Sequence, residues 1–144
     1  MSELLLEIAG VMSRRGTCSR AQVGVVAAID DRIVATAYNG APRGMRHCLH
    51  PPEEISENRP PNASTCTNAV HAEANLVAFA ARHGISLRNA DVYVTTTPCV
   101  VCAQLLINSG VRSVTASSVY RDTTGIHLLS EAGVMIQVPA GETT

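Results

Sequence analysis

Two short motifs in this sequence carry residue types that could bind a metal ion and move a proton. His71 and Glu73 belong to the motif HAE, and Cys99 and Cys102 belong to the motif PCVVC. One histidine nitrogen and two thiolates make three zinc ligands, and three protein ligands plus a water molecule are typical of catalytic zinc sites. Glu73 could lie close to the metal without binding it. The two motifs together therefore predict a catalytic zinc centre.

The expected chemistry at such a centre is the hydrolytic removal of an amino group from a heterocyclic ring. Zinc lowers the pKa of a bound water to about 7, and Glu73 would take the proton of that water. Glu73 would pass it to a ring nitrogen and then to the leaving ammonia. The pattern H-x-E followed by P-C-x-x-C is typical of zinc-dependent nucleobase deaminases.

Two other interpretations of the cysteine pair are open from the residues alone. A C-x-x-C motif is also typical of a thioredoxin-like redox pair. A structural zinc site would normally have a fourth protein ligand, and Glu73 is the only nearby candidate for that position. The presence of HAE and PCVVC in one chain favours deamination over both interpretations.

The elements that position the two motifs are predicted from hydrophobic spacing and turn residues. Residues 3–15 have apolar side chains at helical spacing, and residues 22–30 and 32–39 form a hairpin around Asp30 and Asp31. Further helices are predicted over residues 69–84, 98–110 and 123–133, and further strands over residues 91–97, 111–120 and 134–138.

This order of elements predicts an α/β fold with helices on both faces of one mixed sheet. Pro98 is expected at the first position of its helix, and Gly110 just beyond its end. Helix starts in such folds gather at one edge of the sheet, where ligands bind. The motifs HAE and PCVVC, each at a predicted helix start, can therefore meet.

Length and composition narrow the class of protein. The 144 residues suit one domain over residues 1–144, with an irregular, proline-rich insertion over residues 40–67. The formal net charge of −1 and the aromatic content of 3% disfavour a nucleic-acid partner. No apolar run is long enough for a membrane span, and the N-terminus lacks a signal peptide's basic region. We therefore expect a cytoplasmic protein whose five cysteines serve metal binding or catalysis rather than disulfides.

Five segments resemble the dCMP deaminase branch of the cytidine and deoxycytidylate deaminase family, and the resemblance extends over residues 4–138. They are CSRAQVGVV (18–26), YNGAPRGMRHC (38–48), VHAEANLV (70–77), VYVTTTPCVVCAQLLINSG (92–110) and YRDTTGIHLLSEAGV (120–134). The resemblance implies a three-layer α/β/α sandwich with a five-stranded mixed sheet. It also implies the hydrolysis of dCMP to dUMP and ammonia. A homo-oligomer (hexamer or dimer) and activation by dCTP, bound together with Mg²⁺, are further implications.

The same resemblance assigns roles to the residues of the site. His71, Cys99 and Cys102 match the zinc ligands of the family, and Glu73 matches its proton shuttle. The amide of Ala72 would meet the carbonyl of the pyrimidine.

Other residues are expected to hold the nucleotide. Asn39 would bind it near its sugar or base. A phosphate also needs cationic or hydrogen-bonding partners. The candidates are Arg20, Arg43, Arg46 and Arg121, with Tyr120 as a neighbour. Of these we select Arg20 and Tyr120.

The three remaining cysteines could form a second zinc site. Cys18, Cys48 and Cys66 supply three thiols, and three cysteines with one histidine are a common closed zinc set. His50 is the expected fourth ligand, because His47 is adjacent to Cys48 and would strain to share one ion with it. The alternative is that the three cysteines are ordinary buried thiols.

Two further functions stay open beside dCMP deamination. The same fold could deaminate another small cytosine or amino-heterocycle substrate, such as a nucleoside, a modified dCMP or dCTP. A non-catalytic zinc domain that binds nucleotides would also contain the metal ligands. Glu73 disfavours this last function, because a structural site has no use for a shuttle carboxylate.

Overall fold

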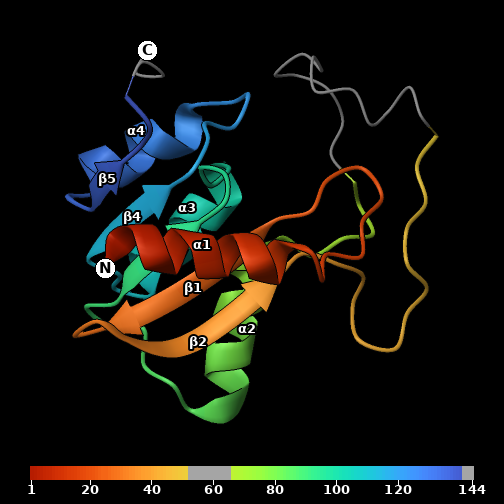
Figure 1. Ribbon diagram of the computed structural model, residues 1–144, viewed down its shortest axis with the longest axis horizontal. Coiled ribbons are helices and arrows are strands. Elements are labelled where there is room, and N and C mark those ends of the chain that lie inside the picture. Colours follow the sequence, from red (N-terminus) through yellow and green to blue (C-terminus); the bar gives the residue numbers. More distant parts are fainter. Residues whose placement is uncertain (52–65, 141–144) are drawn as a thin grey trace.

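The computed structural model describes residues 1–51 and 66–140. Figure 1 shows the nine elements of this part of the chain, in the order αββαβαβαβ that the sequence predicts. They are α1 (Ser2–Ser13), β1 (Gly24–Ile29), β2 (Arg32–Tyr38), α2 (Ala72–His83), β3 (Asp91–Val94), α3 (Val100–Asn108), β4 (Ser113–Ala116), α4 (Thr124–Glu131) and β5 (Met135–Gln137). No helix within the described residues is long and apolar enough to cross a membrane.

The five strands form one mixed sheet in the order β2-β1-β3-β4-β5. Strand β1 pairs antiparallel with both β2 and β3, whereas β3, β4 and β5 pair in parallel. It follows that β2, β3, β4 and β5 all run in one direction and β1 runs in the other. The ends of these four strands and the beginning of β1 therefore share one edge of the sheet.

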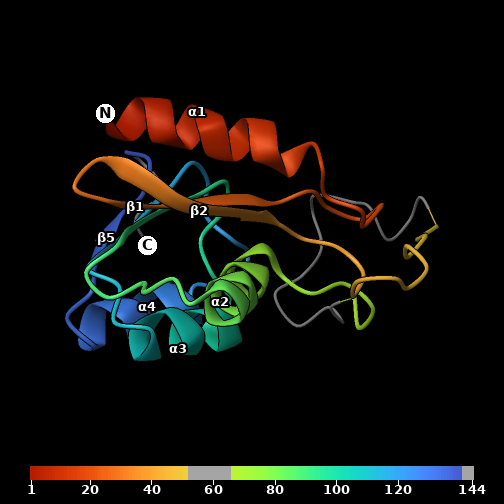
Figure 2. The ribbon, with the colours of Figure 1, turned by 90° about the horizontal axis from the view of Figure 1, so that it is seen from below.

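Helices cover both faces of this sheet, as Figure 2 shows: α1 lies on one face, and α2, α3 and α4 lie on the other. The side chains of β1 alternate between the two sides. Val26 and Ala28 pack with Leu5 of α1, whereas Val25 and Ala27 belong to the larger core under the other three helices. The predicted three-layer α/β/α sandwich with a five-stranded mixed sheet is confirmed.

Two local features explain how the first two strands are placed. Asp30 and Asp31 both have positive φ angles, of 50° and 60°, which a tight hairpin turn between right-handed twisted strands requires. At the start of β1, a Cβ on Gly24 would lie 2.5 Å from the backbone nitrogen of Ser13. Only glycine therefore lets α1 lie so close to this strand.

The starts of α2 and α3 differ from the sequence prediction. Helix α2 begins at Ala72 rather than at residue 69, and α3 begins at Val100, so Pro98 precedes the helix instead of occupying its first position. The residues just before the helices, His71 and Cys99, have extended backbone angles, with ψ of 151° and 172°. Both are N-cap residues, which typically adopt such angles. Each metal-binding motif therefore places one candidate ligand outside its helix.

Candidate active site

The side chains of His71, Cys99 and Cys102 converge at the sheet edge where α2 and α3 begin. Their ligand atoms all lie within 4.8 Å of one another. The Nδ1 atom of His71 lies 3.4 Å from the sulfur of Cys99 and 3.4 Å from the sulfur of Cys102. Among the described residues, Glu73 is not a member of this set. The structure thus brings the three predicted ligands together and leaves the predicted shuttle carboxylate outside them.

The two thiols of this centre differ in their affinity for a proton. The hydrogen bond with Cys102, and then that with His71, lowers the pKa of Cys99 to about 4, against the effect of burial. The hydrogen bond with Cys99 and burial raise the pKa of Cys102. One negative charge is therefore easily formed and shared between the two sulfurs. Such a soft, partly ionised donor set with a neighbouring imidazole fits a zinc ion.

Glu73 lies in the first turn of α2 and is buried, with 4% of its surface exposed. Burial raises the pKa of its carboxyl group, while its own backbone N–H and the charge of His71 oppose this effect. A carboxyl group with a raised pKa holds a proton more readily than an exposed one, which suits a group that must accept a proton and return it.

One cavity contains the predicted catalytic residues and the predicted nucleotide contacts. His71, Glu73 and Cys99 border it, and the four residues that the sequence assigns to the nucleotide also border it: Arg20, Asn39, Ala72 and Tyr120. We call this space the catalytic cavity. The structure places these residues around one space, and their contacts with a nucleotide stay predictions.

The other candidate arginines lie in different places. Arg121 borders the catalytic cavity, and the central carbon of its guanidinium group lies 4.7 Å from the centroid of the Tyr120 ring. Arg43 borders a separate hollow beside β2 and α2. Within the described part of the chain, Arg46 is in the lining of neither space. Arg121 thus joins Arg20 as a cation beside the catalytic cavity.

Asn39 has a local role that the sequence did not reveal. Its side-chain oxygen accepts a hydrogen bond of 2.8 Å from the backbone N–H of Val23, and its side-chain nitrogen donates one of 2.9 Å to the carbonyl of Ala21. Both Ala21 and Val23 border the catalytic cavity. In this structure, the amide of Asn39 therefore holds a wall of the cavity.

The threonines that precede PCVVC were also missed as parts of the site. The hydroxyl oxygen of Thr97 accepts a hydrogen bond of 2.7 Å from the backbone N–H of Tyr120, and that of Thr95 accepts one of 3.2 Å from Gly24. These bonds tie the loop before α3 to the start of β1 and to the segment that follows β4. The available signal was a run of three hydroxyl side chains at the end of the predicted strand over residues 91–97, directly before a ligand motif.

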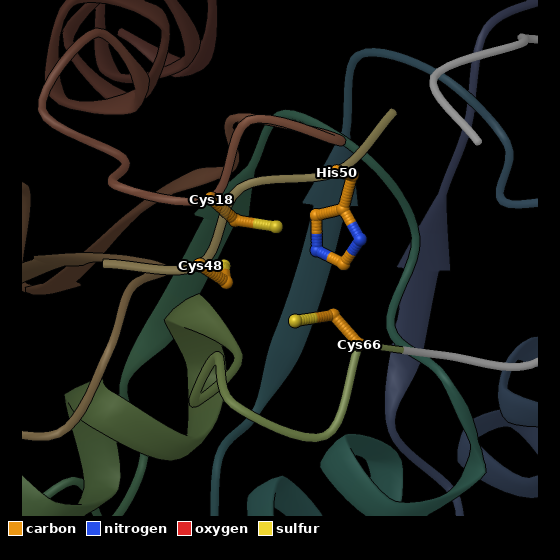
Figure 3. Close-up of side chains that lie close together, drawn as sticks. All are labelled: Cys18, Cys48, His50 and Cys66. Atoms are coloured by element: carbon orange, nitrogen blue, oxygen red, sulfur yellow. The ribbon is translucent and has the colours of Figure 1, made fainter. Parts of the chain in front are cut away.

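A second group of ligand atoms lies nearby (Figure 3). Cys18, Cys48, His50 and Cys66 turn toward one another, and their ligand atoms all lie within 4.8 Å. Burial, followed by hydrogen bonds with the two neighbouring thiols, raises the pKa of Cys48 to about 12. Against the effect of burial, backbone hydrogen bonds lower the pKa of Cys66 to about 6. We call these four residues the second cluster.

Comparison with known proteins agrees with this geometry. The family model described as "Cytidine and deoxycytidylate deaminase zinc-binding region" matches residues 1–118. The chain therefore belongs to the cytidine and deoxycytidylate deaminase family, in its dCMP deaminase branch.

Individual relatives are similar over most of their length. The deoxycytidylate deaminase of Mycobacterium phage D29 is 38% identical over 118 residues, which cover 78% of this chain and 90% of that protein. The deoxycytidylate deaminase of Enterobacteria phage T4 is 30% identical, covering 81% of this chain and 77% of that protein. The dCMP deaminase of cyanophage S-TIM5, solved in complex with dCMP and dUMP, has a TM-score of 0.82, 27% identity and 95% coverage of both chains.

A test of this site is the substitution Gly125→Ala. A Cβ at Gly125, in the first turn of α4, would lie 3.0 Å from the carbonyl oxygen of Cys99 and closer still to that of Pro98. We expect the added methyl group to displace the start of α3, to lower stability by about 1–3 kcal/mol and to weaken zinc retention. Thermal unfolding and zinc content per chain measure both effects.

The matched control for this test is Gly10→Ala in α1, where no atom lies within 4 Å of the added Cβ. This variant should keep its zinc and be as stable as the wild type or more so, by about 1 kcal/mol, because alanine favours helices. Wild-type zinc content and stability in Gly125→Ala would contradict the close packing of α4 against Cys99.

Proposed function

We propose that this chain, as one domain over residues 1–144, is a zinc-dependent hydrolase that converts dCMP and water to dUMP and ammonia. The observation that carries the proposal is the three-ligand centre of His71, Cys99 and Cys102 with a buried carboxylate, Glu73, bordering the same cavity. Three protein ligands leave a coordination position open for chemistry. The similarity to deoxycytidylate deaminases supports dCMP as the substrate.

The residues of the site divide the reaction between them. When bound by His71, Cys99 and Cys102, zinc supplies a Lewis acid that makes water a nucleophile near neutral pH. As the water oxygen bonds to C4 of the cytosine ring, Glu73 accepts one proton from it and delivers that proton to N3. Glu73 then takes the second proton from the hydroxyl group on C4 and passes it to the amino group, which leaves as ammonia as the C4 carbonyl forms. The backbone N–H of Ala72 donates a hydrogen bond to the carbonyl oxygen of the pyrimidine.

The phosphate of the nucleotide needs positive charge and hydrogen-bond donors, since it is a dianion in water near neutral pH. We assign this role to Arg20 and Tyr120, with Arg121 beside them, because all three border the catalytic cavity. Asn39 would act near the sugar or base. The same cavity could accept another small cytosine or amino-heterocycle substrate, such as a nucleoside, a modified dCMP or dCTP.

We further propose that the second cluster binds a zinc ion. Three cysteines and one histidine form a closed set, in which four protein ligands occupy every tetrahedral position. The pKa of about 6 at Cys66 means that a thiolate is available there at neutral pH. Such an ion would hold together three chain segments, because its ligands come from residues 18, 48–50 and 66.

The resemblance to the family extends these proposals to assembly and regulation. We propose a cytoplasmic homo-oligomer, a hexamer or a dimer, that is activated by dCTP with Mg²⁺. Helices α2 and α3, which cover the same face of the sheet, have exposed apolar side chains that support assembly. They are Phe79, Val101 and Leu105. Cytoplasmic location is supported by the five cysteines, which form no disulfide in the described part of the chain.

The first experiment is a measurement of ammonia release from dCMP, deoxycytidine, dCTP and cytosine, each with and without added dCTP and Mg²⁺. We expect turnover of dCMP alone, because the cavity combines the metal centre with cations for a phosphate. A faster reaction in the presence of dCTP would support regulation. Zinc-loaded protein that releases ammonia from none of these compounds would contradict the proposed function.

Glu73→Gln tests the proton shuttle. The amide cannot take a proton from water, so we expect kcat to fall at least about 100-fold while zinc content and fold are kept. Steady-state kinetics, zinc analysis and circular dichroism measure the three quantities. Glu131→Gln, which makes the same change at an exposed position of α4, should match the wild type. Full turnover in Glu73→Gln would refute the mechanism.

Metal analysis tests the second zinc. The wild type should contain about two zinc ions per chain, and Cys66→Ser should contain about one, because it removes one of four ligands of the closed set. Cys99→Ser should lose the other ion instead. A wild-type content of one zinc, unchanged in Cys66→Ser, would show that the second cluster is a group of free thiols.

A further inference from the structure

The second cluster is part of the wall of the catalytic cavity. Cys18 and Cys66 border that cavity together with His71 and Glu73. Cys48 and His50 complete the cluster but, within the described residues, do not border the cavity. The cluster thus has one side toward the catalytic cavity and one side away from it.

The segment from Cys18 to Val23 is the part of the wall that depends on the cluster. It forms no helix or strand, although the structure describes all of its residues. Four of its six residues border the cavity: Cys18, Arg20, Ala21 and Val23. We call residues 18–23 the cavity strap.

The two ends of the cavity strap are held by different groups. At one end, the side chain of Asn39 is hydrogen-bonded to the backbone of Ala21 and Val23. At the other end, Cys18 points into the second cluster, and the backbone N–H of His50 donates a hydrogen bond of 2.7 Å to the hydroxyl oxygen of Ser19. Arg20, the proposed phosphate contact, lies between the two anchored ends.

The catalytic groups are held in another way. His71 and Glu73 belong to the start of α2, and Cys99 and Cys102 to the start of α3. Both helices pack on the main core, in which Ala72 and Ala103 are fully buried. A change in the second cluster would therefore move the cavity strap more than the reacting groups.

We infer that a metal ion in the second cluster sets the affinity of the catalytic cavity for its nucleotide, because it fixes the end of the cavity strap that carries Cys18. The inference rests on the proposed deamination and on the proposed second zinc, and it adds a role in substrate binding to what would otherwise be a structural ion. Preorganised contacts cost less entropy on binding, so a loosened strap weakens the nucleotide complex.

This role predicts a separation of kinetic constants. The cavity strap contacts a part of the nucleotide that does not react, so its interactions are equal in the ground state and the transition state. Loss of such uniform binding raises KM and leaves kcat unchanged. An ion that only stabilised the fold would change neither constant in the folded protein.

Cys48→Ser and His50→Ala are the informative variants, because neither residue borders the catalytic cavity. Each removes a ligand of the second cluster without changing a side chain of the cavity itself. His50→Cys replaces the imidazole by another zinc ligand and should restore the ion. His47→Ala is the matched control: His47 is a neighbouring, exposed histidine outside the cluster.

The measurements are zinc content, kcat and KM for dCMP, and the dissociation constant of dCMP in the inactive Glu73→Gln background. We expect Cys48→Ser and His50→Ala to lose one zinc and to raise KM and the dissociation constant at least about tenfold, with kcat within about twofold of the wild type. His50→Cys and His47→Ala should resemble the wild type. An unchanged KM after loss of one zinc would overturn the inference, and so would a fall in kcat alone.

If both variants fail to fold, wild-type protein reconstituted with one and then two equivalents of zinc replaces them. The second equivalent should tighten dCMP binding about tenfold at constant kcat per active centre, and no change would overturn the inference. Failure of the proposed function has a different signature. In that case the wild type itself would neither bind dCMP nor release ammonia from it.

Discussion

The direction of the strands is the constraint on which the whole site depends. Because β2, β3 and β4 run the same way, the helices that follow them, α2, α3 and α4, all begin at one edge of the sheet. Two residues 28 positions apart, His71 and Cys99, become the N-caps of neighbouring helices at that edge. His71 and Cys99 belong to different motifs, so local structure within HAE or PCVVC alone could not bring these two residues together. The proposed metal centre is thus a product of sheet topology, because two of its three ligands are the N-caps of neighbouring helices.

The single reversed strand, β1, completes the site from the opposite direction. Since β1 runs against its neighbours, the residues that precede it arrive at the edge where the other strands end. The cavity strap therefore faces the starts of α2 and α3 across the catalytic cavity. Asn39 at the end of β2 and Thr95 at the end of β3 bond to residues 21–24. The cavity strap and the proposed metal centre thus come from segments with opposite chain direction, although both border the same cavity.

The sequence predicts the elements and the ligands better than it predicts the wall of the cavity. Periodicity suffices for the helices and the strands, because these depend on local spacing, and the H-x-E and P-C-x-x-C patterns identify the three candidate ligands. The internal hydrogen bonds of Asn39 and the close approach of Gly125 to Cys99 depend on segments far apart in the chain. The predicted starts of α2 and α3 are three and two residues too early. The residue types of His71 and Cys99 do not reveal the extended backbone angles that delay these helices. Residues 52–65 of the predicted insertion, which contain the run EEISENRPPN, lie outside the described residues.

The two clusters show how ligand number decides what similar residues can do. Both combine thiols with one imidazole, yet the first has three ligand residues and the second has four. With four, every tetrahedral position of a zinc ion is filled, so an ion there can only hold chain segments in place. With three, one position would stay open for a water molecule or a substrate, and a buried carboxyl group, that of Glu73, borders the cavity that His71 and Cys99 also border. Burial of an ionised carboxyl group costs free energy, and burial raises the pKa of Glu73. The difference in ligand number and the position of Glu73 thus both support catalysis at the three-ligand cluster and a structural ion at the second cluster.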